Sequence, residues 1–257
     1  MKDSSISRNS IKWWEKLLAV LGWLLIWYIA SRLINQEMLL ASPVSVANRL
    51  WELIYTQPFW HAVGFSLSRV GIGFLLAFTM GILLAVVAWK VRVVAVFLRP
   101  FMGVTKAAPV ASYIILCLLF LPSKNLSVCI SFLMALPVMY TNVLEGLWQM
   151  DRKLLEMAAV FRVPTLRRVL YIYFSQLMPF LVAACSLSLG LCWKSGIAAE
   201  VIGLPLGSIG EHLYQAKIFV DTKTLFAWTV VVIALSFLFE YVFLALLKRL
   251  ATFIERM

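Results

Sequence analysis

Long apolar runs dominate the chain, and they limit its possible folds more than any other feature. About 20 consecutive apolar residues cross a bilayer as an α-helix. Runs of that length recur along the sequence, in which 63% of the 257 residues are hydrophobic and only 14% are charged. Soluble domains average about half apolar and about a quarter charged residues. The sequence therefore predicts an all-α integral membrane protein whose residues 1–257 form a single domain.

Six spans follow from these runs, and we place them at residues 17–34, 63–89, 94–121, 125–145, 169–201 and 225–247. The first span carries bulky Trp23 and Trp27 and is followed by no small-residue cleavage site, so we expect a retained span and not a signal peptide. The fifth span is long enough to tilt or break, and the prolines of the third span, Pro100 and Pro109, can break or kink it. The second span carries small residues every four positions, at Gly73, Ala77, Gly81 and Ala85. Such a stripe lets another helix approach closely, either within the subunit, which we favour, or across a dimer interface.

Two shorter elements lie between the spans. Ser42-Pro43 begins an amphipathic surface helix over residues 44–57. The loop at 203–224 is rich in glycine and has a helical pattern at its centre, with Asp221 or Thr222 suited to cap the last span.

The net charge of +11 indicates membrane topology and not a nucleic-acid partner, because the cations lie between apolar spans. Lys and Arg concentrate in the cytoplasmic loops of membrane proteins. With the N-terminus inside, more than half of the cations are cytoplasmic, and we expect both termini and residues 151–168 on that side. The cations counted there are Lys2, Arg8, Lys12, Lys16, Lys90, Arg92, Arg99, Arg152, Lys153, Arg162, Arg167, Arg168, Lys248, Arg249 and Arg256.

The segment 151–168 is a charged, Ala-rich stretch between two spans. Leu154, Met157, Ala158 and Phe161 fall at helical spacing on one face, which predicts a short amphipathic helix. Pro164 should end this helix, because a proline disfavours the α conformation of the residue before it. The pattern alone leaves two interpretations open: a docking site for a soluble partner, and a helix that rests on lipid headgroups.

The same segment resembles the EAA loop of ATP-binding cassette (ABC) importer permeases, in which E-A-A is followed by a glycine, an isoleucine and Leu-Pro at fixed spacing. Glu156, Ala158 and Ile172 fall at the matching positions. Further matches run along the chain and together resemble the nitrate/sulfonate/taurine branch of binding-protein-dependent permeases. They are Ser42-Pro43 with Val46, Ser66-Leu67 with Arg69 and Gly73-Phe74, Pro100, Lys106 with Pro109, Pro137, Asn142, Gly146, Asp151, Leu154-Leu155-Glu156 and Ala198-Ala199-Glu200.

This resemblance implies a type I importer permease with a cytoplasmic coupling helix. It implies a homodimer, two ATPase subunits that use ATP and Mg²⁺, an extracytoplasmic substrate-binding protein, and a location in the prokaryotic cytoplasmic membrane. The residues implied in ATPase coupling are Asp151, Leu154, Leu155, Glu156, Met157, Ala158, Phe161, Arg162 and Pro164. Four positions depart from the pattern: Met157 replaces an alanine, Arg162 stands at the glycine, and Phe174-Ser175 replaces Leu-Pro.

Polar residues inside the spans are the candidates for a solute pathway or gate. A Lys within a span is costly and needs a function or a partner. Lys194 shares a face with Ser186 and Gly190, and we expect either contact with a polar or anionic solute or a structural pair with Glu240 or Glu200. Glu200 suits a gate or a structural contact equally. The full candidate set is Lys194, Lys106, Pro109, Glu200 and Ser195.

No enzyme or cofactor site is predicted in this chain. His61 and His212 are isolated, and the four cysteines lie in apolar runs without metal-ligand spacing. A phosphate-binding G-x-x-x-x-G-K-[ST] motif is missing from the sequence, so ATP should bind a separate subunit. Two alternatives to an importer permease remain: the membrane component of an energy-coupling-factor vitamin system, whose paired Ala-Arg-Gly motifs are not seen here, and a receptor or assembly factor that moves no solute.

Overall fold

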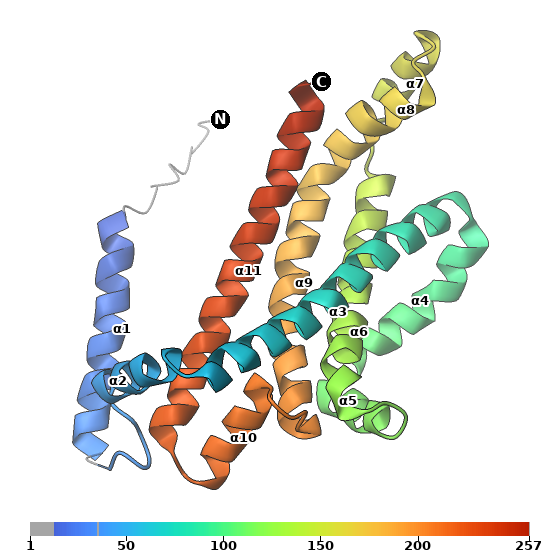
Figure 1. The fold of residues 1–257 in the computed structure, drawn as a ribbon. Helices are drawn as coiled ribbons and strands as arrows, with labels where there is room; N and C mark the ends of the chain where they lie inside the picture. Colours follow the sequence, from blue (N-terminus) through green and yellow to red (C-terminus); the bar gives the residue numbers. More distant parts are fainter. Residues whose placement is uncertain (1–12, 35, 257) are drawn as a thin grey trace, which may run out of the picture.

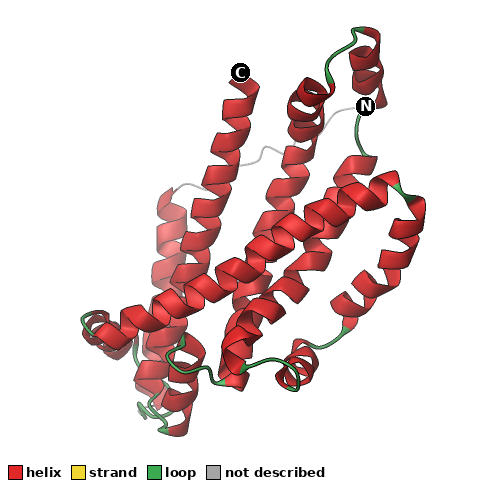
Figure 2. Ribbon diagram, turned by 45° about the vertical axis from the view of Figure 1, so that its right-hand side comes forward, coloured by secondary structure: helices red, strands yellow, loops and turns green. Residues whose placement is uncertain are grey.

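The computed structural model describes residues 13–34 and 36–256, and over these residues the fold contains helices and loops but no strand (Figures 1 and 2). Lys2, Arg8 and Lys12 lie outside this part of the chain. Four helices pass the length and hydropathy requirements of a span by themselves: α1 (Trp13–Ile34), α3 (Gln57–Lys90), α6 (Ser123–Trp148) and α11 (Thr222–Arg256). The continuous helical segment Thr165–Gly203 is the fifth. It contains α8 (Thr165–Arg167), the π-helix η1 (Arg168–Tyr173) and α9 (Phe174–Gly203). This confirms the all-α membrane fold.

The predicted third span, 94–121, is not one continuous helix. It is divided into α4 (Arg92–Ala107) and α5 (Val110–Leu118), whose axes differ by 102°. Ala108 takes an extended conformation with ψ 141° directly before Pro109, as the clash between a proline ring and its predecessor favours. Counted as one bent span, the pair brings the total within the described residues to six.

The core lies where α3, α6 and α9 pack together, and small residues permit their close approach. Gly73, Ala77, Gly81 and Ala85 are all buried. A Cβ added at Gly73 would lie 2.6 Å from the carbonyl oxygen of Val128 on α6. On α9, a Cβ at Gly196 would lie 2.5 Å from Ser131 Oγ. The stripe of small residues on α3 therefore packs within the subunit, the interpretation we favoured.

Gly73→Ala should separate α3 from α6 and lower the stability of the fold. The added methyl meets a backbone oxygen that no rotamer change can move, and overpacking a core costs about 1–3 kcal/mol. Gly64→Ala on the same helix is the matched control, because nothing lies within 4 Å of its added Cβ and alanine favours helix by about 1 kcal/mol. The check is the thermal unfolding midpoint in detergent. Equal midpoints for the two variants would contradict this packing.

The bundle has two distinct ends (Figure 1). One end carries α2 (Pro43–Ile54), α5 and α10 (Ile209–Ile218); the other carries α7 (Arg152–Val160), α8 and the last turns of α11. At the first end, Ser42 caps α2 by accepting a hydrogen bond from the Ser45 amide at 3.2 Å. Asp221 caps α11 by accepting from the Thr224 amide at 3.1 Å, which confirms one of the two predicted caps.

Candidate functional site

The segment predicted to dock a partner forms a short helix at one end of the bundle, in contact with little else of the protein (Figure 1). Helix α7 begins after Asp151, whose side chain accepts a hydrogen bond from the Lys153 amide at 2.9 Å. The Asp151 amide donates to Gln176 Oε1 on α9 at 2.8 Å, which fixes the start of the helix against the bundle. Helix α7 therefore projects from the membrane domain but has a defined position.

One face of α7 presents apolar side chains to the surroundings. Leu154, Met157 and Phe161 keep 40%, 48% and 75% of their surface exposed. Leu155 is half-buried, and Glu156 is exposed with no hydrogen bond or ion pair from its side chain to another described residue. Exposed apolar patches rimmed by charges are typical of binding surfaces. The predicted face differs at Ala158, which is fully buried because it turns toward the chain's own following segment.

The end of α7 is formed by Arg162 and not by Pro164. The helix ends at Val160, and Arg162 adopts a left-handed φ of +51°. The Arg162 amide then donates to the Ala159 carbonyl at 3.1 Å, and the Val163 amide to the Ala158 carbonyl at 2.9 Å. These two bonds form a Schellman motif, in which the left-handed position is usually glycine. Arg162 thus makes the turn that glycine makes in the family pattern, while Pro164 precedes α8.

Arg162→Gly should stabilise this turn. A left-handed conformation costs a residue with a Cβ roughly 1–2 kcal/mol, a cost that glycine does not carry. We expect slower hydrogen exchange of the α7 amides in the variant, by about tenfold for 1.4 kcal/mol. Arg162→Ala is the control, because it removes the guanidinium but keeps the Cβ. Equal slowing in both variants would show that the charge, and not the backbone conformation, strains the turn.

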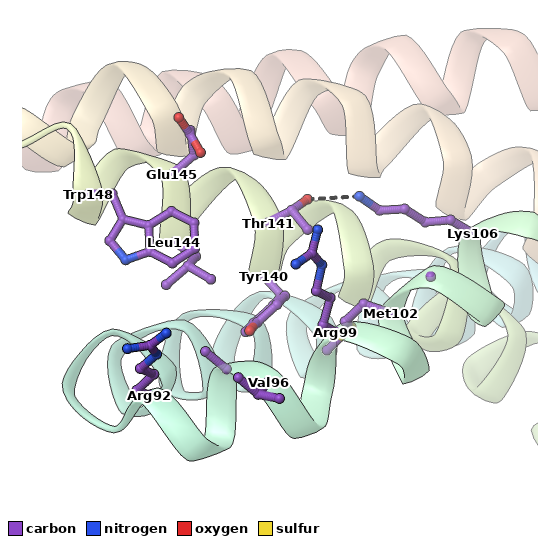
Figure 3. Close-up of a pocket in the computed structure, with 12 residues that line it drawn as sticks. Arg92, Val96, Arg99, Met102, Lys106, Tyr140, Thr141, Leu144, Glu145 and Trp148 are labelled. Atoms are coloured by element: carbon purple, nitrogen blue, oxygen red, sulfur yellow. Dashed lines mark hydrogen bonds between the residues drawn. The ribbon is translucent and has the colours of Figure 1, made fainter.

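A cavity of about 630 Å³ lies between α4 and α6 (Figure 3). Helix α4 contributes three cations, Arg92, Arg99 and Lys106, and α6 contributes Tyr140 and Thr141. Lys106 Nζ donates to Thr141 Oγ1 at 3.1 Å. The complete lining is Arg92, Ala95, Val96, Arg99, Met102, Gly103, Lys106, Tyr140, Thr141, Leu144, Glu145 and Trp148.

The second embedded lysine, Lys194, lies in a different cavity of about 540 Å³ between α9 and α11. Glu240 lines the same cavity, and its carboxylate accepts a hydrogen bond from Ser186. Lys194 is exposed and forms no ion pair with Glu240 or Glu200 in the described part of the chain. The structure therefore does not bring Lys106 and Lys194 together in one site.

The other two polar candidates lie in the packed interior. Glu200 is fully buried, and its Oε2 accepts hydrogen bonds from Ser66 Oγ at 2.6 Å and from the Gly210 amide at 3.3 Å. Ser195 is also buried, and its hydroxyl donates to the Leu191 carbonyl of its own helix at 2.7 Å. Neither residue lines the α4–α6 cavity or the α9–α11 cavity.

Arg99 lines the cavity but is not among the pathway residues predicted from the sequence. It lies in the middle of α4 and points into the cavity toward α6 (Figure 3). The spacing of Arg92, Arg99 and Lys106 at intervals of seven residues was the available signal, because residues seven apart share a helix face.

Comparison with known proteins agrees with these features. Residues 77–252 match the family model described as "Binding-protein-dependent transport system inner membrane component". The chain is 24% identical over 226 residues to a Bacillus subtilis permease named for aliphatic sulfonate transport, a match that covers 87% of this chain and 82% of the relative. It is 26% identical over 204 residues to a nitrate import permease of Synechococcus elongatus, with 75% and 72% covered. A bicarbonate transport system permease of the same organism is 25% identical over 225 residues, and the match covers 80% of each chain.

The family match covers more than half of the chain and includes the α4–α6 cavity, α7 and α9. Together with the apolar helices, it identifies a multi-pass membrane protein. The chain belongs to the family of binding-protein-dependent transport system inner membrane components, the permeases of ABC transporters.

Proposed function

We propose that this chain is the permease subunit of an ABC importer and forms the transmembrane pathway for a small anionic solute. The observation that carries the proposal is the pair of features at one end of the molecule: an exposed apolar helix, α7, and a cation-lined cavity that opens along α4. The relatives add the solute class, because they are named for sulfonate, nitrate and bicarbonate transport, and all three solutes are small anions.

Coupling to ATP hydrolysis is assigned to α7. Its exposed residues Leu154, Met157 and Phe161 suit a cleft on an ATPase subunit, and Glu156 and Arg162 supply charges beside them. ATP and Mg²⁺ are bound by two such subunits and not by this chain. Closure of the ATPases moves α7, and the bundle responds by alternating access between the two membrane sides.

The remaining partners follow from the same assignment. A second copy of the chain completes the pathway, and an extracytoplasmic binding protein delivers the solute to the end that carries α2, α5 and α10. The end that carries α7 is then cytoplasmic, and so are both termini. The excess of Lys and Arg in segments assigned to that side supports this orientation.

Reconstitution tests the function directly. The chain is co-expressed with an ATPase and a binding protein from the same genome, chosen as those that co-purify with it, and the purified complex is placed in liposomes. We expect ATP-dependent uptake of at least one of nitrate, bicarbonate and ethanesulfonate, and none without the binding protein. A stable complex that hydrolyses ATP but takes up none of the three probes would contradict the anion assignment. A chain that binds a soluble partner but no ATPase would favour the receptor alternative.

A further inference from the structure

The three cations of α4 form a row along one helix face. Arg92, Arg99 and Lys106 are seven residues apart, so each step rises about 10.5 Å and returns to nearly the same face. Between them the cavity is lined by small or apolar side chains, which leaves the cationic groups as the main polar feature of this wall. We refer to Arg92, Arg99 and Lys106 as the α4 cation row.

The positive charge of this row is not neutralised within the subunit. None of the three cations forms an ion pair with a described residue. Glu145 is the single acidic residue of the cavity lining, and its carboxylate accepts a hydrogen bond from Gln149 Nε2 at 2.6 Å. In Figure 3 the Glu145 carboxylate lies well away from both Arg92 and Arg99. All three residues are exposed in the isolated subunit, and an unpaired cation at membrane depth is costly, which points to a ligand that supplies the missing negative charge.

The row extends along α4 from one end of the bundle toward the middle of its length. Arg92 is the first residue of α4, next to the connection from α3, and can reach headgroups by snorkelling. Lys106 lies two turns beyond Arg99, where its ammonium contacts Thr141 on α6. Thr141 is seven residues before the end of α6 at Trp148, so it lies about 10 Å inside that end. Lys106 therefore lies farther from this end of the bundle than Arg92 does.

We propose that the α4 cation row binds the transported oxyanion in the half of the pathway nearest α7 and guides it toward that end. Lys106, with the hydroxyl of Thr141, forms the deepest position; Arg99 and Arg92 form the next two. This inference rests on the proposed function for the identity of the ligand. A lipid phosphate has the same chemistry, so the experiment must separate the two sources.

The rate at which charged reagents label a cysteine in the cavity reports the electrostatic potential there, and this measurement does not require transport. Val96 lines the cavity between Arg92 and Arg99, and Val96→Cys is made in a variant whose four native cysteines are replaced by alanine. The complete transporter is reconstituted in phosphatidylcholine and treated with anionic or cationic methanethiosulfonates. We expect the anionic reagent to react preferentially, and Arg99→Gln to lower that preference by at least about fivefold, since one nearby charge contributes about 1 kcal/mol or more. Lys248→Gln, an exposed lysine on α11 outside the cavity, is the matched control and should change nothing.

Protection of the same cysteine identifies the occupant. Nitrate, bicarbonate or ethanesulfonate should slow labelling more than chloride at equal ionic strength, and Lys106→Gln should abolish this protection while Lys106→Arg retains it. Protection that appears only when phosphatidylglycerol is added would assign the row to lipid headgroups and overturn the proposal. Equal labelling by both reagents would overturn it as well. Because neither readout requires uptake, a protected cavity in a complex that transports none of the probes would count against the proposed function and not against the binding site.

Discussion

Glu156→Arg is expected to release the ATPase subunits from the membrane domain and to reduce ATP-driven uptake to background. Glu156 is exposed, and its side chain has no partner among residues 13–34 and 36–256, so we expect its replacement to leave the fold of the bundle unchanged. The new arginine would join Arg152, Lys153 and Arg162 on a nine-residue helix and its turn, and Asp151 at the N-cap would be the one carboxylate left there. Like charges placed against a partner's complementary surface cost several kcal/mol. The measurement is ATPase co-purification, which we expect to fall at least about tenfold for a loss of 1.4 kcal/mol.

Glu37→Arg is a suitable control for this experiment. Glu37 lies near the opposite end of the bundle in an exposed ion pair with Lys223, and surface pairs of this kind contribute about 0–1 kcal/mol. The control reverses a charge as Glu156→Arg does but should keep the ATPase bound. Full co-purification and uptake in Glu156→Arg would show that α7 lies on the membrane surface and does not dock the ATPase.

The membrane class and most helix positions could be predicted from the sequence because both depend on local composition. A run of about 20 apolar residues has few alternatives to a spanning helix, since its backbone polar groups must be satisfied internally. The cap at Ser42 and the cap at Asp221 were likewise readable, because a short polar side chain before a helix has a characteristic bonding pattern. These features require no knowledge of distant contacts.

The breaks in the helices were harder to predict because the same residue type has different outcomes. Pro100, Pro137 and Pro179 all lie inside helices, whereas Pro109 separates α4 from α5. The difference lies in the residue before each proline, because Ala108 takes the extended conformation that a following proline favours, whereas the helices continue through the other three prolines. The left-handed turn at Arg162 was also hard to predict, because arginine, like other residues with a Cβ, seldom adopts a positive φ.

The sequence could not group the candidate pathway residues into cavities, for a similar reason. Span assignment cannot show which embedded polar groups share a cavity, and the structure places Lys106 with Arg99 but Lys194 with Glu240. The stripe of small residues predicts a packing position at Gly73 but not at Gly196, and both glycines lie at close contacts between helices. The contacts of Gly73 with Val128 and of Gly196 with Ser131 join residues more than 50 positions apart in the sequence.

Glu200→Ala is expected to destabilise the protein, whereas Glu200→Gln should preserve most of its stability and uptake. The carboxylate of Glu200 is buried where α9, α3 and α10 meet, and it accepts bonds from Ser66 Oγ and the Gly210 amide. Ser66 Oγ also accepts from the Ile209 amide at 3.1 Å, so the pair satisfies two of the first amides of α10. Removing a buried acceptor leaves its donors unsatisfied, at about 1–3 kcal/mol. We expect a loss of about that size in the alanine variant, seen as a lower unfolding midpoint in detergent.

The glutamine variant distinguishes a structural contact from a gate. Its amide oxygen can accept the same two hydrogen bonds, but it carries no charge. The fit around Glu200 is close, because a Cβ on Gly210 would lie 2.3 Å from the Glu200 Cβ, and the site has little space in which a charged side chain could swing. A structural contact therefore predicts that Glu200→Gln keeps both the unfolding midpoint and the uptake rate. An unchanged midpoint with a large loss of uptake would instead show that the charge itself acts during transport, and would assign Glu200 to the gate.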